Sequence, residues 1–318
     1  MSFTAAKIEQ QLKRVIIGKD DVIDFTLAAI LAGGHVLLED MPGTGKTTLA
    51  LAVSRSLGLD FKRIQLTPDT VASDITGYSA FDSRTHEFRF HHGAAMTDLL
   101  LADELNRTSG KTQAALLEAM EEGSITVDGI THKLPEPFCV IATQNPSGTA
   151  GTSEIPLSQL DRFMVKLSLG RVDKAALRQI LTDRSGSDPL ESVEQVCSKS
   201  ELLKVMGECR QVYLSDAIYD YVCELWQAAE SCGSLKHGIS PRGALALCKM
   251  AKAAAYLGGR DHVVPSDIRS CFVPVCAHRV IISPEARLRG EGVGEILEKL
   301  LDEVKTPESR ALSGKRAK

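Results

Sequence analysis

The stretch at positions 40–47, Asp-Met-Pro-Gly-Thr-Gly-Lys-Thr, has the residue types that bind a polyphosphate. A polyphosphate concentrates several negative charges in a small volume, so its site needs exposed backbone N–H groups, a cation and a hydroxyl that can hold Mg²⁺. Gly43 and Gly45 leave the N–H groups unshielded by side chains. Lys46 can reach the β and γ oxygens, and Thr47 can ligate the metal. The stretch therefore predicts a phosphate-binding loop.

The neighbours of this loop support the same interpretation. An apolar run at His35–Leu38 predicts a strand before it, and a helical pattern at Thr47–Leu57 follows it. The alternative is a glycine-containing turn with an incidental lysine, which this strand–loop–helix order disfavours. One residue departs from the usual pattern, because Asp40 stands where glycine is expected.

Two carboxylates, Asp103 and Glu104, follow an apolar run at Asp98–Ala102 that predicts a buried strand. Hydrolysis at a bound Mg-nucleotide needs one carboxylate that holds the metal and one that takes a proton from the attacking water. We assign the first role to Asp103 and the second to Glu104. Paired acids at a strand end are common on protein surfaces, so the assignment depends on the phosphate loop that precedes them.

Three further polar side chains are candidates for the same site. Asn145 follows the apolar run Phe138–Thr143 and could orient the lytic water, although an Asn before a proline also opens many turns. Arg162, between a helix and a strand, could neutralise charge at a neighbouring subunit's nucleotide. Arg242, near the start of a helix, could reach the phosphates of its own subunit. For both arginines the alternative is a solvated side chain or one paired with a carboxylate.

Apolar β-rich runs alternate with helical patterns through the first half of the chain. This alternation predicts an α/β fold with a five-stranded parallel sheet covered by helices. The predicted strands are His35–Leu38, Phe61–Gln65, Asp98–Ala102, Phe138–Thr143 and Phe163–Ser168. Two shorter patches predict hairpins, with turns at Asp82–His86 and at Asp128-Gly129.

After about Gly170 the pattern becomes helical only, so we expect a smaller all-α domain at residues 171–305. The predicted helices are Lys174–Asp183, Ser200–Gln211, Ser215–Ser231, Pro241–Leu257 and Glu295–Val304. The nucleotide-binding α/β domain would then span residues 1–170. The polar and basic tail at 306–318 is expected to be disordered.

The composition is typical of a soluble globular protein. The chain has 318 residues, 43% of them hydrophobic and 25% charged, and a formal net charge of −4, which gives no overall attraction to nucleic acid or anionic lipid. The longest largely apolar stretch, Phe25–Leu38, falls short of the ~20 residues of a membrane span, and no secretory signal is visible. We therefore expect a cytoplasmic protein without membrane insertion, whose eight scattered cysteines are reduced and mostly buried.

Several motifs, taken in their order along the chain, closely resemble the MoxR family of AAA+ ATPases. They are Met-Pro-Gly-Thr-Gly-Lys-Thr (41–47), Leu-Ala-Asp-Glu-Leu-Asn-Arg (101–107), Ala-Leu-Leu-Glu-Ala-Met-Glu-Glu (115–122), Ile-Ala-Thr-Gln-Asn-Pro (141–146), Gln-Leu-Asp-Arg-Phe (159–163) and Ser-Pro-Arg-Gly (240–243). The resemblance runs from about Val15 to His278, nearly the whole chain. It implies a five-stranded parallel sheet, an α-helical lid and a hexameric ring with ATP bound between subunits.

The resemblance also implies a role for each candidate residue. The adenine pocket would be lined by Val15, Ile16, Ile17 and Gly18. The Walker A loop would comprise Pro42, Gly43, Thr44, Gly45, Lys46, Thr47 and Thr48. Walker B would be Asp103 and Glu104, sensor 1 Asn145, the arginine finger Arg162 and sensor 2 Arg242. The two hairpins would be the family's helix-2 insert and its pre-sensor-1 hairpin.

These observations together predict a Mg-ATP-hydrolysing ring motor that remodels or matures protein or metalloenzyme clients. Members of the resembled family often work with von Willebrand factor A domain proteins, which the resemblance therefore implies as partners. Two alternatives remain open: a motor that remodels nucleic acid, and a scaffold that binds ATP with little turnover. The acidic chain and its 5% aromatic residues disfavour the first, and the set of Glu104, Asn145 and Arg162 disfavours the second.

Overall fold

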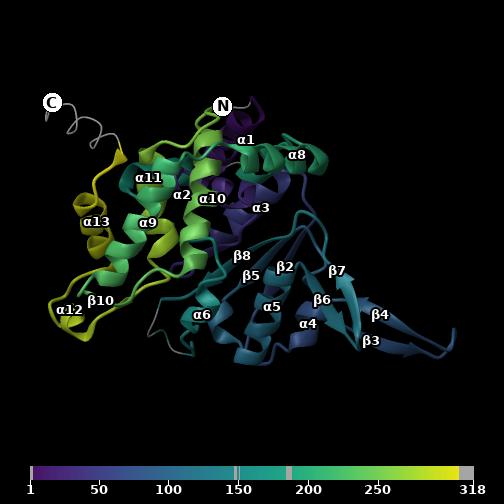
Figure 1. Cartoon of the computed structure of the whole chain (residues 1–318). Helices are drawn as coiled ribbons and strands as arrows, with labels where there is room; N and C mark the ends of the chain where they lie inside the picture. The colour runs from purple at the N-terminus through teal and green to yellow at the C-terminus, as the bar shows by residue number, and fades with distance from the viewer. Residues whose placement is uncertain (1–2, 147–148, 150, 184–187, 308–318) are drawn as a thin grey trace, which may run out of the picture.

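A five-stranded sheet forms the centre of the first half of the chain (Figure 1). The computed structural model describes residues 3–146, 149, 151–183 and 188–307. The sheet is built from β1 (Val36–Glu39), β2 (Phe61–Gln65), β5 (Leu99–Asp103), β8 (Cys139–Gln144) and β9 (Val165–Leu167). The strands are ordered β2-β5-β8-β1-β9, and every neighbouring pair is parallel. The predicted five-stranded parallel sheet is confirmed, and its carboxyl ends meet at one edge.

Side chains of the central strands are buried on both faces of the sheet, which is why these strands read as continuous apolar runs. In β5, Leu99 and Leu101 belong to one apolar cluster, whereas Leu100 and Ala102 belong to another. The first cluster includes residues of α1 (Phe3–Val15), α2 (Asp20–Leu31) and α3 (Lys46–Ser56). The second includes residues of α4 (Ala72–Thr76) and α5 (Gly110–Glu122). Each face is therefore covered by helices, as in other α/β folds.

Both predicted hairpins are present as antiparallel pairs outside the central sheet. The first joins β3 (Gly77–Asp82) and β4 (Glu87–His92) and projects from the body of the molecule (Figure 1). The second joins β6 (Ser124–Val127) and β7 (Ile130–Lys133). Asp128 and Gly129 at its turn both have left-handed φ angles, 50° and 79°, as a two-residue turn of this kind requires.

Helices dominate the chain after Gly170, and five of them had been predicted. These are α7 (Lys174–Asp183), α8 (Lys199–Gln211), α9 (Asp216–Ser231), α10 (Pro241–Leu257) and α13 (Val293–Glu303). The helices α11 (Pro265–Cys276) and α12 (Pro284–Leu288) and the short helix η2 (Pro189–Ser192) also lie in this part of the chain. Two other short helices, η1 (Leu105–Arg107) and α6 (Leu157–Leu160), precede Gly170.

The expectation that this part contains helices only is wrong in one detail. The strands β10 (Leu235–His237) and β11 (Ile281–Ile282) pair antiparallel and form a small sheet. Strands of three and two residues are too short to show an alternating pattern, so the sequence carries no signal for them.

One apolar core connects the helical part to the sheet. The cluster that contains Leu99 and Leu101 continues into α8, α9, α10, α11 and α13. The predicted boundary between residues 170 and 171 remains a prediction, and of the predicted tail only residues 306 and 307 lie within the described residues. None of the helices in the described ranges is long and apolar enough to cross a membrane. All eight cysteines are free thiols, and five of them are buried.

Candidate functional site

A cleft of about 800 Å³ lies at the carboxyl edge of the sheet. Parallel sheets bind ligands at this edge because loops and helix N-termini converge there. Most of its lining consists of residues that the sequence predicts for a nucleotide site, namely Val15, Ile16, Ile17, Pro42, Gly43, Thr44, Gly45, Lys46, Thr47, Thr48, Asp103, Glu104 and Asn145. Gly18 does not line the cleft; with a φ of 70° it forms the turn before α2.

The phosphate loop is open toward the cleft. Gly43 and Gly45 have φ angles of 86° and 97°, which side chains rarely adopt. A Cβ atom added at either glycine would meet no other atom within 4 Å, so the space beside the loop is free. The helix α3 begins directly afterwards, at Lys46, and its first N–H groups have no partner within the helix. The loop therefore has the conformation and the room to hold an anion.

Lys46 is buried and folds back onto its own loop. Its ammonium donates to the backbone oxygens of Asp40 at 2.8 Å and Met41 at 3.1 Å. Burial lowers the pKa of Lys46, and the carboxylates of Asp40, Asp103 and Glu104 oppose this shift. Three nearby carboxylates thus favour the positive charge of a partly desolvated ammonium, which can exchange the carbonyl oxygens for phosphate oxygens.

The hydroxyl of Thr143, at the end of β8, connects the two acidic residues. It donates to Asp103 Oδ1 at 2.6 Å and accepts a hydrogen bond from the Glu104 backbone N–H at 2.8 Å. Asp103 Oδ2 accepts a second hydrogen bond, from Arg63, at 2.7 Å. Glu104 has a left-handed φ of 59°, an uncommon conformation for a side chain of this type. Local strain of this kind is concentrated at functional sites.

The carboxylate of Glu104 is held by three polar side chains. Gln65 donates to Oε2 at 2.8 Å, Arg107 donates to the same oxygen at 2.9 Å, and the Asn145 amide lies 3.5 Å from Oε1. Asn145 is buried, and its backbone exchanges hydrogen bonds with the side chain of Asn106. The structure thus brings Asn145 next to Glu104, where an amide can help to orient a water molecule.

The two predicted arginines lie outside the cleft and close to each other. Arg162 donates to the Leu117 backbone oxygen at 2.6 Å and pairs with Glu121 at 3.0 Å. Arg242 pairs with the same carboxylate of Glu121, on α5. Neither arginine lines the cleft, so the expectation that Arg242 reaches the phosphates of its own subunit is not reproduced in this arrangement. The structure groups Arg242 with Arg162 instead.

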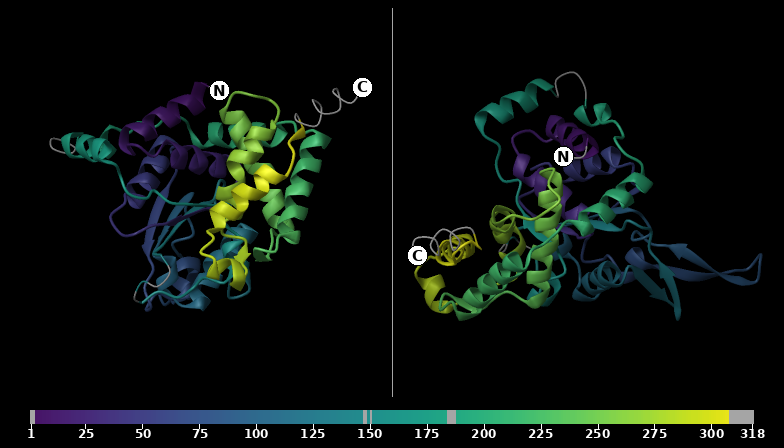
Figure 2. Two further views of the ribbon diagram at one scale, coloured as in Figure 1. Left: turned by 90° about the vertical axis from the view of Figure 1, so that its left-hand side faces the viewer. Right: turned by 45° about the horizontal axis from the view of Figure 1, so that its top comes forward.

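Several cleft residues were not predicted. They are Lys19, Arg63, Gln65, Leu169, Gly170, Arg171, Val172, Leu177 and Ile180. Arg63 and Gln65 lie on β2, where Gln65 is in register with Asp103, so strand alignment could have found them. The others are Lys19, which directly precedes α2, and residues of the segment after β9 and of α7, which lies at the edge of the molecule (Figure 2). Their place depends on how the helical part packs, which no local pattern specifies.

The donor set at the cleft suits a magnesium ion that enters with a nucleotide. Thr47 offers a hydroxyl and Asp103 a carboxylate, and Mg²⁺ prefers such oxygen ligands together with phosphate and water. Among the described residues, no group of three His, Cys, Asp or Glu side chains could hold a metal alone. The open glycine loop and the buried Lys46 fit the phosphates that would supply the remaining ligands.

Comparison with known proteins also indicates an ATPase. Residues 35–165 match the family described as ATPase family associated with various cellular activities (AAA), and residues 227–300 match the AAA lid domain. The Bacillus subtilis (strain 168) protein YeaC is 44% identical over 305 residues, which cover 96% of this chain and 95% of YeaC. Chaperone MoxR1 of Mycobacterium tuberculosis is 33% identical, with 95% of this chain and 82% of MoxR1 covered.

A crystal structure of a candidate ATPase from Cytophaga hutchinsonii has the same fold. It superposes with a TM-score of 0.88 at 34% sequence identity, and the match covers 95% of this chain and 94% of that one. Protein MoxR of Methylorubrum extorquens is 30% identical, with 95% of each chain covered. With the ordered sheet, the phosphate loop and the helical lid already in place, these matches show that the chain belongs to the MoxR family of AAA+ ATPases.

Proposed function

We propose that this protein is a Mg-dependent ATP hydrolase that works in a homo-oligomeric ring as a chaperone-like motor. The observation that carries the proposal is the cleft, in which the phosphate loop, Asp103, Glu104 and Asn145 all line one cavity. Glycines in left-handed conformations, a buried lysine and a strained acidic residue at a strand end are the parts that phosphoryl transfer to water requires.

Each group has a distinct task in this proposal. The backbone N–H groups of the loop and Lys46 bind the phosphates, and the apolar side chains of Val15–Ile17 and Leu177 contact the base. Magnesium, held by Thr47 and Asp103, neutralises phosphate charge when it is bound. Glu104 accepts a proton from the attacking water. Water attack becomes possible because that proton has a carboxylate oxygen to move to.

Asn145 orients the same water through its amide. Its buried backbone is fixed by Asn106, and its side chain already lies beside Glu104. An amide has both a donor and an acceptor, so it can hold the water and contact the γ-phosphate at the same time. This arrangement links the presence of the γ-phosphate to the position of the nucleophile.

Arg162 and Arg242 serve the nucleotide of a neighbouring subunit. Both are half-exposed, both lie outside the cleft of their own chain, and both pair with Glu121. An arginine with such a partner can exchange it for a phosphate that a second copy brings. Completion of the site by a second subunit is the reason for proposing a ring, and six subunits is the number we favour.

The client is proposed to be a protein, because one relative is named a chaperone. A metalloenzyme assembly is the kind of client that we favour. We further propose von Willebrand factor A domain proteins as partners and the cytoplasm as the location. Nucleic acid is not expected to be a partner, because the net charge of −4 offers no general attraction to phosphate backbones.

The test compares two variants in the cleft. Lys46→Ala should lose tight ATP binding in calorimetry, because the loop keeps its N–H groups but loses its cation. Glu104→Gln should still bind ATP, whereas kcat should fall by ~10²–10⁴-fold, because an amide cannot accept the proton. Glu298→Gln, on the exposed face of α13, is the matched control and should behave like the parent protein. Unchanged turnover in Glu104→Gln would place the general base elsewhere.

A further inference from the structure

Asp40 departs from the usual phosphate-loop pattern, and its side chain has a specific set of partners. The residue is 5% exposed. Its Oδ1 accepts hydrogen bonds from Ser168 Oγ at 2.7 Å and from the Gly170 backbone N–H at 2.9 Å. Its Oδ2 accepts one from the Leu169 backbone N–H at 2.7 Å. One carboxylate therefore binds three consecutive residues, which directly follow β9.

The segment that Asp40 holds leads from the sheet into the helical part. Leu169 is buried, and residues 169–172 line the same cleft as the phosphate loop. Two positions further on, α7 begins and contributes Leu177 and Ile180 to the cleft lining. This apolar wall, defined as Leu169, Val172, Leu177 and Ile180, offers contacts to a flat, apolar group such as a base. Arg171, in the same stretch, also lines the cleft and adds one cation to it.

The backbone of Asp40 belongs to the other half of the cleft. Its oxygen accepts a hydrogen bond from the Lys46 ammonium, and its N–H donates to the Gln144 backbone oxygen at 3.2 Å. The residue thus joins the phosphate-binding end, through its backbone, to the apolar wall, through its side chain. Hydrogen bonds to an ionised acceptor are shorter and stronger than neutral ones, which suits a fixed spacing between the two ends.

Glycine at this position could not make that connection. The N–H groups of Leu169, which is buried, and of Gly170, which is partly buried, would lose their acceptor, so the segment would have to move to find other partners. The phosphate loop itself would keep its left-handed glycines and its lysine. Loss of the carboxylate should therefore affect the apolar wall more than the phosphate site.

We propose that Asp40 is a positioning residue that fixes the apolar wall at the distance a nucleoside triphosphate requires. The cleft then binds the whole nucleotide more tightly than the bare triphosphate chain. This inference rests on the proposed function, because it takes the cleft to be the nucleotide site. Beyond the proposed function, the inference assigns to Asp40 the selectivity of the cleft for the nucleoside part of the ligand.

The experiment measures the affinities of the full chain for Mg-ATP and for Mg-tripolyphosphate by calorimetry. In Asp40→Asn the amide NH₂ group replaces one accepting oxygen and must face an N–H or O–H donor of residues 168–170. The affinity for ATP should therefore fall about tenfold or more relative to the parent chain, while the affinity for tripolyphosphate stays within about twofold. Ser168→Ala removes one of the three hydrogen bonds and should lower the ATP affinity by a smaller factor. The control is Glu39→Gln, one residue before Asp40. Glu39 pairs with Lys166 and not with residues 168–170, so this variant should leave both affinities unchanged.

The outcomes separate this inference from the proposed function. If the parent chain binds neither ligand, the nucleotide site itself is wrong and the inference fails with it. If the parent chain binds ATP but both affinities fall equally in Asp40→Asn, the carboxylate shapes the phosphate loop and the inference alone is overturned. Should Asp40→Asn not fold, Ser168→Ala decides, since an unchanged ratio of the two affinities in that variant also overturns the inference.

Discussion

At the scale of single residues, the acidic pair is positioned by neighbours on two adjacent strands. Thr143, on β8, binds both Asp103 and the backbone of Glu104. Arg63 and Gln65, on β2, hold one carboxylate each. The two carboxylates thus lie at the end of a strand that has a neighbouring strand on either side, and each has only part of its hydrogen-bonding capacity free for a ligand.

Arg63 should compete with magnesium for Asp103. The ion pair between Arg63 and Asp103 is 2.7 Å long, and its arginine is about half exposed. It places a positive charge next to the carboxylate oxygen that a metal ion would approach. An exposed ion pair has an interaction free energy of about 0.2–1 kcal/mol, which magnesium must overcome to bind Asp103. Arg63→Ala should therefore lower the Mg²⁺ concentration for half-maximal ATPase activity by about 1.4- to 5-fold. A magnesium titration of the steady-state rate measures this. A higher magnesium requirement in the variant would show that Arg63 assists the bound metal-nucleotide instead.

The sequence predicts the cleft residues that follow strand ends. Asp103, Glu104 and Asn145 follow the ends of apolar runs, and Lys46 belongs to the loop that follows another; the parallel sheet brings these ends to one edge. The place of Arg242 could not be predicted in the same way. It depends on the orientation of the helical part, which long-range contacts between residues more than a hundred positions apart decide.

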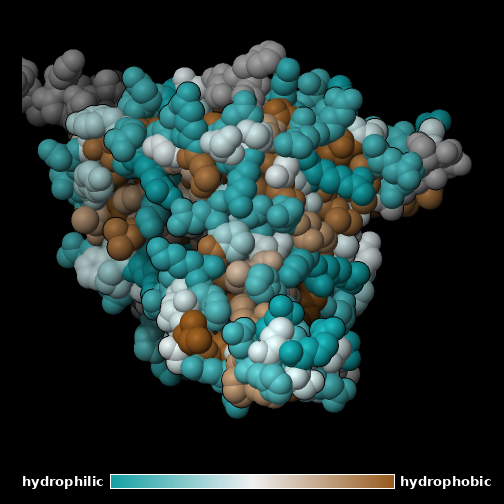
Figure 3. All heavy atoms as spheres, turned by 90° about the vertical axis from the view of Figure 1, so that its right-hand side faces the viewer, coloured by the Kyte–Doolittle hydropathy of each residue, from teal (hydrophilic) through white to brown (hydrophobic). Residues whose placement is uncertain are grey.

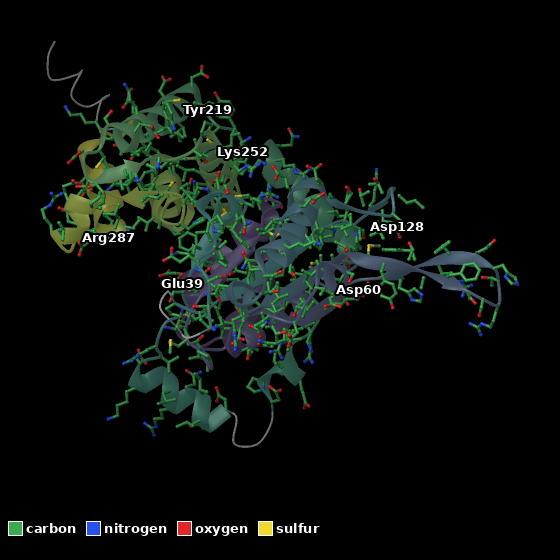
Figure 4. The ribbon with its side chains drawn as sticks, turned by 90° about the horizontal axis from the view of Figure 1, so that it is seen from below. Glu39, Asp60, Asp128, Tyr219, Lys252 and Arg287 are labelled. Carbon is green, nitrogen blue, oxygen red and sulfur yellow. The ribbon has the colours of Figure 1, made fainter. Side chains whose placement is uncertain are left out.

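At the scale of elements, the β3–β4 hairpin leaves several large apolar side chains outside the core. Phe88 is 75% exposed, Phe81 55% and Tyr78 54%. The end of the molecule that carries the hairpin shows apolar and polar residues intermixed (Figure 3). Asp128, at the tip of the β6–β7 hairpin, lies beside the base of the β3–β4 hairpin (Figure 4). The rings of Phe90, on β4, and His132, on β7, are stacked, so the two hairpins are in contact.

Shortening the β3–β4 hairpin should leave the ATPase intact and weaken client binding. Residues 83–86 can be replaced by Asn-Gly, since Asp82 and Glu87 are directly paired and that dipeptide forms a two-residue turn. The basal rate should stay within about twofold, because loops outside the core carry contacts at little cost to the fold. Both the ATPase rate and the proteins retained by a Glu104→Gln background should be measured. A large loss of basal activity or of folded protein would make the hairpin a structural element.

A buried ion pair joins the arginine-bearing turn after α6 to the helical part. Arg279, which follows α11, pairs with Asp161 at 2.8 Å and donates to the backbone oxygens of Phe163 and Met164 at 2.5 and 3.1 Å. Ser240, the N-cap of α10, also binds Asp161. Burial lowers the pKa of the Arg279 guanidinium, and Asp161 is among the groups that oppose this shift. This network is why Arg162 and Arg242 lie together.

Arg279→Met should destabilise the fold strongly. Removing one member of a buried pair leaves the carboxylate of Asp161 without its charge partner, which costs about 3–5 kcal/mol of unfolding free energy. Arg84→Met at the exposed tip of the β3–β4 hairpin is the control, and its unfolding free energy should stay unchanged within error. Denaturant unfolding of both variants gives the comparison. A small effect in Arg279→Met would mean that the backbone contacts of this region suffice without the pair.

Small elements mark the limit of what the sequence predicts. Long strands and capped helices such as α10 follow from local patterns, and Ser240 does accept a hydrogen bond from the Gly243 N–H as an N-cap should. The β10–β11 pair unites segments more than forty positions apart and has only five residues. Its formation reflects how α9 to α12 pack, so tertiary structure outweighs local propensity there.

At the scale of the whole molecule, the proposed ring would give each subunit two incomplete halves of an active site. One is the cleft at the carboxyl edge of the sheet, and the other is the pair of arginines held by Glu121. Arg287, in the helical part, lies at the opposite side of the molecule from the β3–β4 hairpin (Figure 4). If the arginines act on a neighbour, hydrolysis is a property of the interface, and defects in the two halves can complement each other.

Mixed rings provide the test. Arg162→Ala should bind ATP almost normally yet turn over slowly, because an arginine finger acts mainly while charge develops on the γ-phosphoryl group. Lys46→Ala has no working phosphate loop but keeps both arginines. In an equal mixture, about a quarter of the interfaces should pair an intact loop with an intact finger, so about a quarter of the parent rate should return. No recovery in rings whose mixed composition is confirmed by mass spectrometry would make Arg162 a residue of its own subunit's site.

The same mixture made with Arg242→Ala distinguishes the two possible roles of that arginine. If Arg242 serves the neighbour's nucleotide, Lys46→Ala subunits supply it and activity returns, as it does for Arg162→Ala. If it serves its own subunit, every intact phosphate loop in the mixture belongs to a chain without Arg242, and no mixing ratio restores the rate. The geometry predicts recovery, because one carboxylate, that of Glu121, holds both arginines outside the cleft of their own chain.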